Sequence, residues 1–351
     1  MTGISPPTVS LIVPTLERPD FLLRLIRFYQ ASRFTGKILI GDGGNTSRVQ
    51  QTKVALRHAA PGLDIGYWHF PGAGVAQVVR ELSSEVSTPY VALVADDDFL
   101  VPSALEKCAA FLKNNSDYSA AHGSGILITL ASTGAHGKIA RCGYYPQPQR
   151  EETSAAQRLV AHLGNYSVSL FSLHRIEIWR KMFSATKDVR DVSFGAELLP
   201  CCLSVVLGKT KQLDGLMLVR QAHSRRYHLP NVHDWITDEA WCPSYAIAYE
   251  SLAKEISHQD CVSLNQARAE VKRGFSMYLQ NIQKRRAAHN ITLWRDRIRR
   301  IPSAPFIWRW AQRMMPGSEF SLPKLLNPSS PHHTDFLKIR DAITQSPDII
   351  I

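Results

Sequence analysis

The chain has 351 residues, of which 44% are hydrophobic and 20% charged, and it carries a formal net charge of +11. These are the fractions of an ordinary soluble protein, and the length allows one large domain or two smaller ones. No apolar run approaches the roughly 20 residues that a membrane span needs. Pro6-Pro7 lead straight into an expected strand without a secretory leader, and the six cysteines lack metal-ligand spacing. We therefore expect reduced thiols and a cytoplasmic protein.

Strand and helix signals alternate over the first 130 residues, the pattern that produces a mostly parallel α/β sheet. The expected strands are residues 9–13, 37–40, 65–70 and 90–94. The expected helices are residues 20–31, which carry an apolar stripe at helical spacing, a segment ending at Leu82, and a segment capped by Ser103 and ending at Leu112.

Three consecutive aspartates, Asp96, Asp97 and Asp98, follow the expected strand that begins at Tyr90. Carboxylates at such a strand end project into the crevice where α/β sheets bind ligands. Three like charges on one loop are unfavourable unless positive charge lies among them. A divalent cation carrying a diphosphate would supply that charge, so Mn²⁺ or Mg²⁺ is the predicted cofactor. An ordinary acidic turn is the alternative.

Beyond residue 124 the order of elements is less regular. The expected strands are 125–130, 168–171 and 213–220, and the expected helices begin at Ser154, Ile176 and Leu198. Residues 131–152, rich in Gly, Pro and Gln, are expected to form a loop. From Leu229 onward the signals are helical. The predicted division is a catalytic domain over residues 1–229 and a basic, mainly helical C-terminal extension over residues 230–351.

Three motifs in this order resemble the family 2 glycosyltransferases of the GT-A fold. They are the opening strand that ends in Pro14-Thr15, the turn from Gly41 to Gly44, and the aspartates from Asp96 to Asp98. The resemblance covers about residues 8–228, and Glu197 and His223 lie at distances along the chain that strengthen it. It implies a GT-A-like, mostly parallel sheet flanked by helices. The implied activity is an inverting, metal-dependent transfer of a sugar from a nucleoside-diphosphate donor to a hydroxyl acceptor.

On the donor side, the resemblance places Pro14 and Thr15 against the nucleoside and Asp42 at the base or ribose, because carboxylates accept bonds from N–H and hydroxyl groups. Gly41 stands where the family usually has a first acid. Arg80 is expected to face the diphosphate, since guanidinium groups pair strongly with phosphate. The structural alternatives are a strand-ending Pro-Thr, a tight Asp-Gly turn and an exposed helical arginine.

The implied metal ligands are Asp98, Asp96 and His223. Asp96 is also expected to face the ribose, and Asp97 leaves the register of the Asp-x-Asp pair open. Arg225 and Arg226 could face the diphosphate once a loop over residues 227–235 closes. The alternative for His223 is a surface histidine.

Glu197 matches the acid that serves as general base in the resembled family, where it would take the proton of the acceptor hydroxyl. Asp191 is the second candidate for the base, or a ligand of the acceptor hydroxyl. An acid at a helix start also favours the helix dipole, which is the structural alternative for Glu197. A single displacement at the anomeric carbon would invert its configuration.

The positive charge is concentrated between Arg268 and Arg313, where twelve Lys or Arg residues face two acids, Glu270 and Asp296. Aromatic residues from Trp294 to Trp310 are interspersed with these cations, which suits an interfacial helix on anionic lipid. We therefore expect contact with the inner face of a membrane, and a glycan or lipid-linked acceptor in cell-surface polysaccharide or glycolipid assembly. A packed helical subdomain is the alternative. Nucleic acid is disfavoured, because no recognition motif accompanies the charge.

Two other function classes remain open. A nucleotidyltransferase would also carry acids at strand ends, but a glycine-rich loop with a lysine is expected near its N-terminus, and the loop from Pro14 to Arg18 has no glycine. A non-catalytic module that binds nucleotide-sugars or glycans would keep the fold. Loss of the Asp-x-Asp pair or of the base would favour that module, but the sequence retains both the pair and the base.

Overall fold

The computed structural model describes residues 8–224, 232–298 and 320–345. Its strands are β1 (Val9–Thr15), β2 (Lys37–Asp42), β3 (Asp64–His69), β4 (Tyr90–Leu93), β5 (Phe99–Leu100), β6 (Tyr118–Leu130), β7 (Ile139–Tyr145), β8 (Leu173–Arg175) and β9 (Lys209–Ala222). Within the described residues these nine strands form one sheet, in the order β3-β2-β1-β4-β8-β6-β9-β5, and β7 pairs with β6.

The first four strands of the order are parallel, with β1 between β2 and β4. The apolar side chains of β1, β2 and β4 are almost entirely buried, which is why the sequence has continuous apolar runs there rather than alternation. From β1 the chain continues to β2 and β3 on one side and later to β4 on the other. The carboxyl ends of β1 and β4 therefore flank a switch point, the place where open α/β sheets bind ligands.

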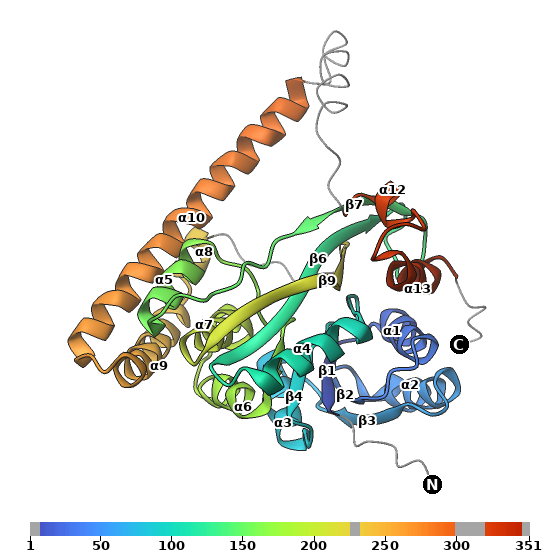
Figure 1. Ribbon diagram of the computed structural model, residues 1–351, viewed down its shortest axis with the longest axis horizontal. Helices are drawn as coiled ribbons and strands as arrows, with labels where there is room; N and C mark the ends of the chain where they lie inside the picture. Colours follow the sequence, from blue (N-terminus) through green and yellow to red (C-terminus); the bar gives the residue numbers. More distant parts are fainter. Residues whose placement is uncertain (1–7, 225–231, 299–319, 346–351) are drawn as a thin grey trace.

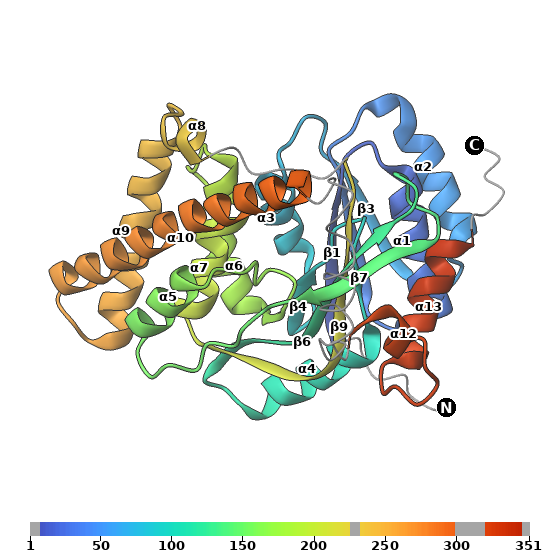
Figure 2. The ribbon, with the colours of Figure 1, turned by 90° about the horizontal axis from the view of Figure 1, so that it is seen from above.

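Helices cover both faces of the sheet. They are α1 (Pro19–Ala31), α2 (Thr46–Ala59), α3 (Val75–Glu85), α4 (Pro102–Asn114), α5 (Ala155–Gly164), α6 (Ile176–Ser184), η1 (Phe194–Leu198), α7 (Leu199–Val206), α8 (Val232–Ile236), α9 (Trp241–Asp260), α10 (Leu264–Ile298), α12 (Leu322–Leu325) and α13 (His333–Thr344). Figure 2 shows the sheet nearly edge-on, with α1, α2 and α13 on one side and α3, α6 and α7 on the other. The predicted stripe of α1, including Leu22, Leu25 and Tyr29, is buried.

The C-terminal residues contact two separate parts of the molecule. The helices α9 and α10 pack on α5, and α10 extends as a long helix along one side of the molecule (Figure 1). The helix α13 returns to pack against α1, and Gly137 N donates to the carbonyl of Ile343 at 3.0 Å. The predicted boundary between residues 229 and 230 lies outside the described residues, so that division stays a prediction. None of the helices described is both long and apolar enough to cross a membrane.

The predicted α/β class, a sheet flanked by helices, is confirmed, although the sheet is mixed beyond β4. The prediction of a strand at 168–171 is wrong, because the strand in this region is β8, which has three residues and begins at Leu173. The expected loop 131–152 contains β7, whose mostly exposed side chains give no strand periodicity. The expectation that Ser154 begins a helix is confirmed, and this residue forms a capping box with Gln157.

Three buried histidines should make the fold sensitive to acid. Burial lowers the pKa of His122 to about 4, and the pKa of His162 and His174 to about 3. In the unfolded chain their pKa is about 6.5, so below that pH the unfolded state binds protons that the folded state excludes. The free energy of unfolding should therefore fall as the pH drops from about 6.5 to about 4.

The variant His174→Gln should reduce this pH dependence by about one proton, or about 1.4 kcal/mol per pH unit near pH 5. Urea unfolding of the wild type and the variant at several pH values between 5 and 7 measures it. The exposed His258, changed to Gln, is the matched control. Equal slopes for wild type and His174→Gln would contradict the assignment.

Candidate functional site

The three aspartates lie where the sequence predicts, directly after β4 and opposite the end of β1. Asp96 accepts a hydrogen bond from Thr15 Oγ1 at 2.6 Å, and Arg18 Nη2 forms an ion pair with Asp96 Oδ1 at 2.5 Å. Arg18 also donates to Asp97 Oδ2 at 3.1 Å. Because Pro19 begins α1, Arg18 stands in the turn between β1 and α1, which directs it to the aspartates.

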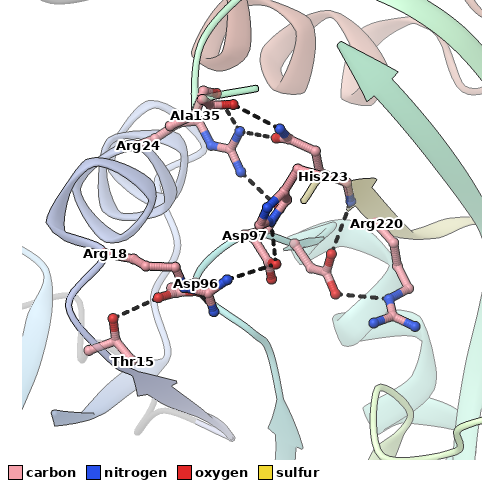
Figure 3. A network of polar contacts seen from close by, with 11 residues as sticks. Thr15, Arg18, Arg24, Asp96, Asp97, Ala135, Arg220 and His223 are labelled. Carbon is pink, nitrogen blue, oxygen red and sulfur yellow. Dashed lines mark hydrogen bonds and ion pairs between the residues drawn. The ribbon is translucent and has the colours of Figure 1, made fainter. Parts of the chain in front are cut away.

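His223, the residue just past β9, meets the middle aspartate. Its Nε2 lies 2.8 Å from Asp97 Oδ2, and its ring stacks on Phe21 of α1 with centroids 4.7 Å apart. Figure 3 shows Arg18 and His223 converging on Asp97. The position near the aspartates agrees with the sequence prediction, but the imidazole contacts a carboxylate.

The third aspartate, Asp98, is bound from β9. Arg220 Nε donates to its Oδ2 at 3.0 Å, and the backbone N–H of Gln221 donates to its Oδ1 at 3.0 Å. Arg220 also donates to the hydroxyl of Tyr145 at 3.0 Å, and its guanidinium lies 4.5 Å from the ring centre of Phe171. Both oxygens of Asp98 are therefore already hydrogen-bonded.

A fully buried arginine, Arg24 of α1, contacts the backbone of the aspartate loop. It donates to the backbone carbonyl of Asp97 at 2.8 Å, to that of Ala135 at 2.5 Å, and to the side chain of Gln221. Burial lowers its pKa to about 10, so it remains a cation at neutral pH. Arg24 thus connects α1, the aspartate loop, the β6–β7 connection and β9.

Burial dominates the electrostatics of the aspartate cluster. It raises the pKa of Asp96 to about 7, an effect that Arg18 and Thr15 oppose and the two neighbouring aspartates increase. Burial also lowers the pKa of Arg220, but Asp98 and Tyr145 outweigh it and raise that pKa overall. The cluster is thus an interdependent set of buried carboxylates and guanidinium groups.

Glu197, the predicted base, lies in η1, one turn of π-helix of the kind often found at functional sites. The hydroxyl of Tyr166 donates to its Oε1 at 2.9 Å. Tyr145 accepts a hydrogen bond from Arg220, the partner of Asp98; burial raises the pKa of Tyr145, Arg220 opposes this, and Glu197 and Asp98 increase it. The segment that holds Glu197 through Tyr166 continues to Phe171, which packs against Arg220, the partner of Asp98.

The carboxylate of Asp191, the second candidate for the base, is hydrogen-bonded to other parts of the protein. Its Oδ1 accepts from the backbone N–H of Phe194 at 2.8 Å, and its Oδ2 accepts from Trp235 Nε1 at 2.9 Å. Its own backbone N–H donates to Ser244 Oγ at 2.9 Å. These contacts fix the start of η1, so Asp191 positions the turn that carries Glu197.

Pro14 and Thr15 of β1 lie opposite Gly41 and Asp42 of β2. Asp42 accepts from the backbone N–H of Gly44 at 2.7 Å and from the Tyr67 hydroxyl. A small cleft is lined by Asp42 together with Thr15 and Arg18, the two residues that contact Asp96. A side chain at Gly41 would meet Val78 of α3, since a Cβ there would lie 2.3 Å from its Cγ1, so an acid cannot fit as packed.

The remaining predicted residues are not brought to the aspartates by any described contact. Arg80 is half-buried on α3 and forms no hydrogen bond or ion pair with another described residue. Arg225 and Arg226, with most of the expected loop over residues 227–235, lie outside the described residues. Three further residues of the cluster, Arg18, Arg24 and Arg220, were not predicted from the sequence, although Arg18 ends the first loop and Arg220 ends the strand predicted at 213–220.

The described residues do not fit the expected Mn²⁺ or Mg²⁺. Asp96, Asp98 and His223 are the predicted ligands, but each faces a separate protein partner rather than a common point. Across residues 8–224, 232–298 and 320–345, no group of three or more His, Cys, Asp or Glu side chains could hold a metal ion. The counter-charges of the aspartates in this arrangement are guanidinium groups.

Comparison with known proteins gives distant structural likenesses. No family model matches the chain, and no curated protein matches it. It is similar to S. aureus TarS 1–349 in complex with UDP-GlcNAc, with 14% identity, a TM-score of 0.42, and 80% of this chain and 92% of that one covered. It is also similar to glucosyl-3-phosphoglycerate synthase from Mycobacterium tuberculosis, with 11% identity, a TM-score of 0.36, and 73% and 81% covered. Likeness at this level assigns neither activity nor substrate to this chain.

The variant Arg24→Met should destabilise the protein by about 3 kcal/mol or more, because it leaves several buried acceptors without a donor and removes a cation beside three carboxylates. Urea unfolding measures the change in the free energy of unfolding. Arg57→Met, at an exposed arginine of α2, is the control and should shift it by less than about 0.5 kcal/mol. A loss below about 1 kcal/mol in Arg24→Met would contradict the role assigned to Arg24.

Proposed function

We propose that the protein transfers a glycosyl group from a nucleoside-diphosphate sugar to a hydroxyl acceptor, as an inverting glycosyltransferase with a GT-A-like fold. The observation that carries this proposal is that one segment, residues 166–171, contacts both groups: Tyr166 donates to Glu197, and Phe171 packs against the guanidinium of Arg220, the partner of Asp98. A candidate base and a guanidinium group that can bind an anion are thus positioned by the same short segment. A single-displacement transfer needs both of these groups.

Residues at the ends of β1 and β2 support the nucleoside side of the proposal. Asp42 and Thr15 are adjacent in register, and the cleft they line continues to Arg18. Each carboxylate oxygen has two lone pairs, so Asp42 can accept a further bond from a ribose hydroxyl or a base N–H while keeping its contacts to Gly44 and Tyr67. The identities of the base and of the sugar are outside this proposal.

On the acceptor side, Glu197 is the proposed base. The acceptor oxygen attacks the anomeric carbon, and its proton passes to the Glu197 carboxylate. The bond from that carbon to the diphosphate oxygen breaks, and its electron pair leaves with the nucleoside diphosphate. One displacement inverts the anomeric configuration. Tyr166 would hold the carboxylate in place, and Asp191 would hold η1 in position.

The variant Glu197→Gln should bind nucleotide with unchanged affinity but transfer sugar about 10²–10⁴-fold more slowly, because the amide cannot take the proton. Calorimetric titration of UDP, GDP and CDP measures binding. Release of nucleoside diphosphate from a panel of sugar donors and acceptors measures transfer. The exposed Glu85, changed to Gln, is the matched control and should behave as wild type.

The other two function classes are distinguishable when the same assays are extended to nucleoside triphosphates. Transfer at the wild-type rate by Glu197→Gln would remove Glu197 as the base. Donor binding by the wild type with no transfer across the whole panel would favour the non-catalytic binding module. Release of pyrophosphate from a nucleoside triphosphate would favour a nucleotidyltransferase.

We also propose that the basic C-terminal segment attaches the protein to an anionic membrane surface, where a glycan or lipid-linked acceptor would be used. The side chains concerned lie beyond residue 284, outside the side chains that the structure describes. The support is therefore the sequence itself, in which arginines alternate with Trp and Phe between residues 294 and 313.

The full chain should sediment with vesicles that contain phosphatidylglycerol but not with phosphatidylcholine vesicles, and added salt should release it. Each cation near the surface contributes about 1 kcal/mol, so a variant with four fewer should no longer sediment. The four changes are Arg295→Gln, Arg297→Gln, Arg299→Gln and Arg300→Gln. The control changes four exposed cations elsewhere, namely Arg57→Gln, Arg141→Gln, Lys187→Gln and Lys254→Gln. Equal sedimentation of the two variants would contradict the proposal.

A further inference from the structure

The proposed function does not say which cation balances the negative charge of the aspartate loop. Asp96 and Asp98 are fully buried, so keeping either of them ionised requires a counter-charge beside it. Three arginines supply that charge. Arg18 pairs with Asp96 and Asp97, Arg220 pairs with Asp98, and Arg24 donates to the backbone beside them. The formal charges of the three aspartates and the three arginines cancel.

A divalent cation would have to fit beside these partners or displace them. Asp98 uses both oxygens, one on Arg220 and one on the backbone N–H of Gln221, and a backbone donor cannot turn away without moving β9. Asp96 is held by Thr15 and Arg18. A metal bound to either carboxylate would also lie within a few ångströms of a guanidinium, where like charges repel. The donor set therefore opposes metal binding.

Two of the arginines remain partly accessible to solvent, and one of them, Arg18, lines the small cleft beside Thr15 and Asp42. The side chains of Arg18 and Arg220 are 18% and 14% exposed. Arg220 uses its Nε on Asp98 and one Nη1 donor on Tyr145, whereas a guanidinium has five N–H groups. Donors therefore remain on Arg220 for a second anion. Guanidinium groups bind phosphate oxygens in a strong, bidentate manner.

We propose that this site binds the diphosphate of its nucleotide through Arg18 and Arg220, and that it does so without a divalent cation. The inference rests on the proposed function, since it concerns the diphosphate of the same donor. The aspartates then have a different role from the one that the sequence suggests. They orient the guanidinium groups and keep them charged, and the guanidinium groups face the leaving diphosphate.

The first experiment titrates UDP, GDP and CDP calorimetrically into the full chain, once in EDTA and once with Mn²⁺ or Mg²⁺. The nucleotide that binds should have dissociation constants in the two buffers that differ by less than about threefold. Manganese alone, titrated into the protein and followed by electron paramagnetic resonance of free Mn²⁺, should show no stoichiometric binding. Both measurements use the wild type, so they do not depend on a variant folding.

The second experiment repeats the EDTA titration with Arg220→Gln and Arg18→Gln. Each variant should bind the nucleotide about 10- to 100-fold more weakly, the effect of losing a hydrogen bond to a charged group. Arg57→Gln should bind as wild type. Circular dichroism melting confirms that each variant is folded. Arg220→Lys should not restore full affinity, because an ammonium cannot form the bidentate contact.

The outcomes separate the inference from the proposed function. Nucleotide binding that appears only with Mn²⁺ or Mg²⁺ would overturn the inference and leave the glycosyltransferase proposal intact. Stoichiometric binding of Mn²⁺ alone would also overturn the inference. Metal-free binding that both folded variants retain unchanged would overturn the role of the arginines. If no nucleotide binds to the folded wild type in either buffer, the proposed function and the inference both fail.

Discussion

Three carboxylates buried at the carboxyl end of β4 are the constraint on which this structure depends. An aspartate in a fully buried position is costly unless it is paired and hydrogen-bonded, and this loop has three in succession. The partners come from segments far apart in the sequence. Arg18 and Arg24 belong to the region of α1, whereas Arg220 and His223 belong to the end of β9. Neutralising the aspartates therefore brings the beginning of the α/β region against its last strand.

Arg24 extends this constraint beyond the aspartates. By donating to Ala135 and Gln221 it fixes the connection between β6 and β7 against α1, and Gln221 in turn donates to the carbonyl of Gly134 at 3.0 Å. The same connection contacts the C-terminal residues, where Gly137 donates to Ile343. Since α13 also packs on α1, the end of the described chain belongs to the same packed unit as the site. The helices α9 and α10 instead support η1, through Ser244 and the aromatic residues around Phe194.

The sequence was sufficient to predict those elements that produce a pattern within a short stretch of neighbouring residues. Strands such as β1 and β4 are buried on both faces and form continuous apolar runs, so they and the aspartates that follow could be placed in advance. The edge strand β7 is mostly exposed, and β8 has only three residues, so neither has a usable periodicity. The pairing of Arg220 with Asp98 joins residues 122 positions apart, and no local pattern encodes such a contact. Asp191 shows the same limit: its residue type suits a base, and the contact of its carboxylate with Trp235, 44 positions away, has no local signal.

The choice of counter-charge has consequences for how such a site works. A divalent cation brings two charges in one small ion, arrives from solution and must be partly dehydrated to bind. An arginine brings one charge, is covalently fixed, and is weakly hydrated, so it can be buried beside a carboxylate with less loss of solvation. Two arginines are then needed to match the charge of one metal ion, and Arg18 and Arg220 lie on either side of the aspartate loop. The three aspartates make this arrangement possible, because without them the buried guanidinium groups of the cluster would repel one another and lack a counter-charge.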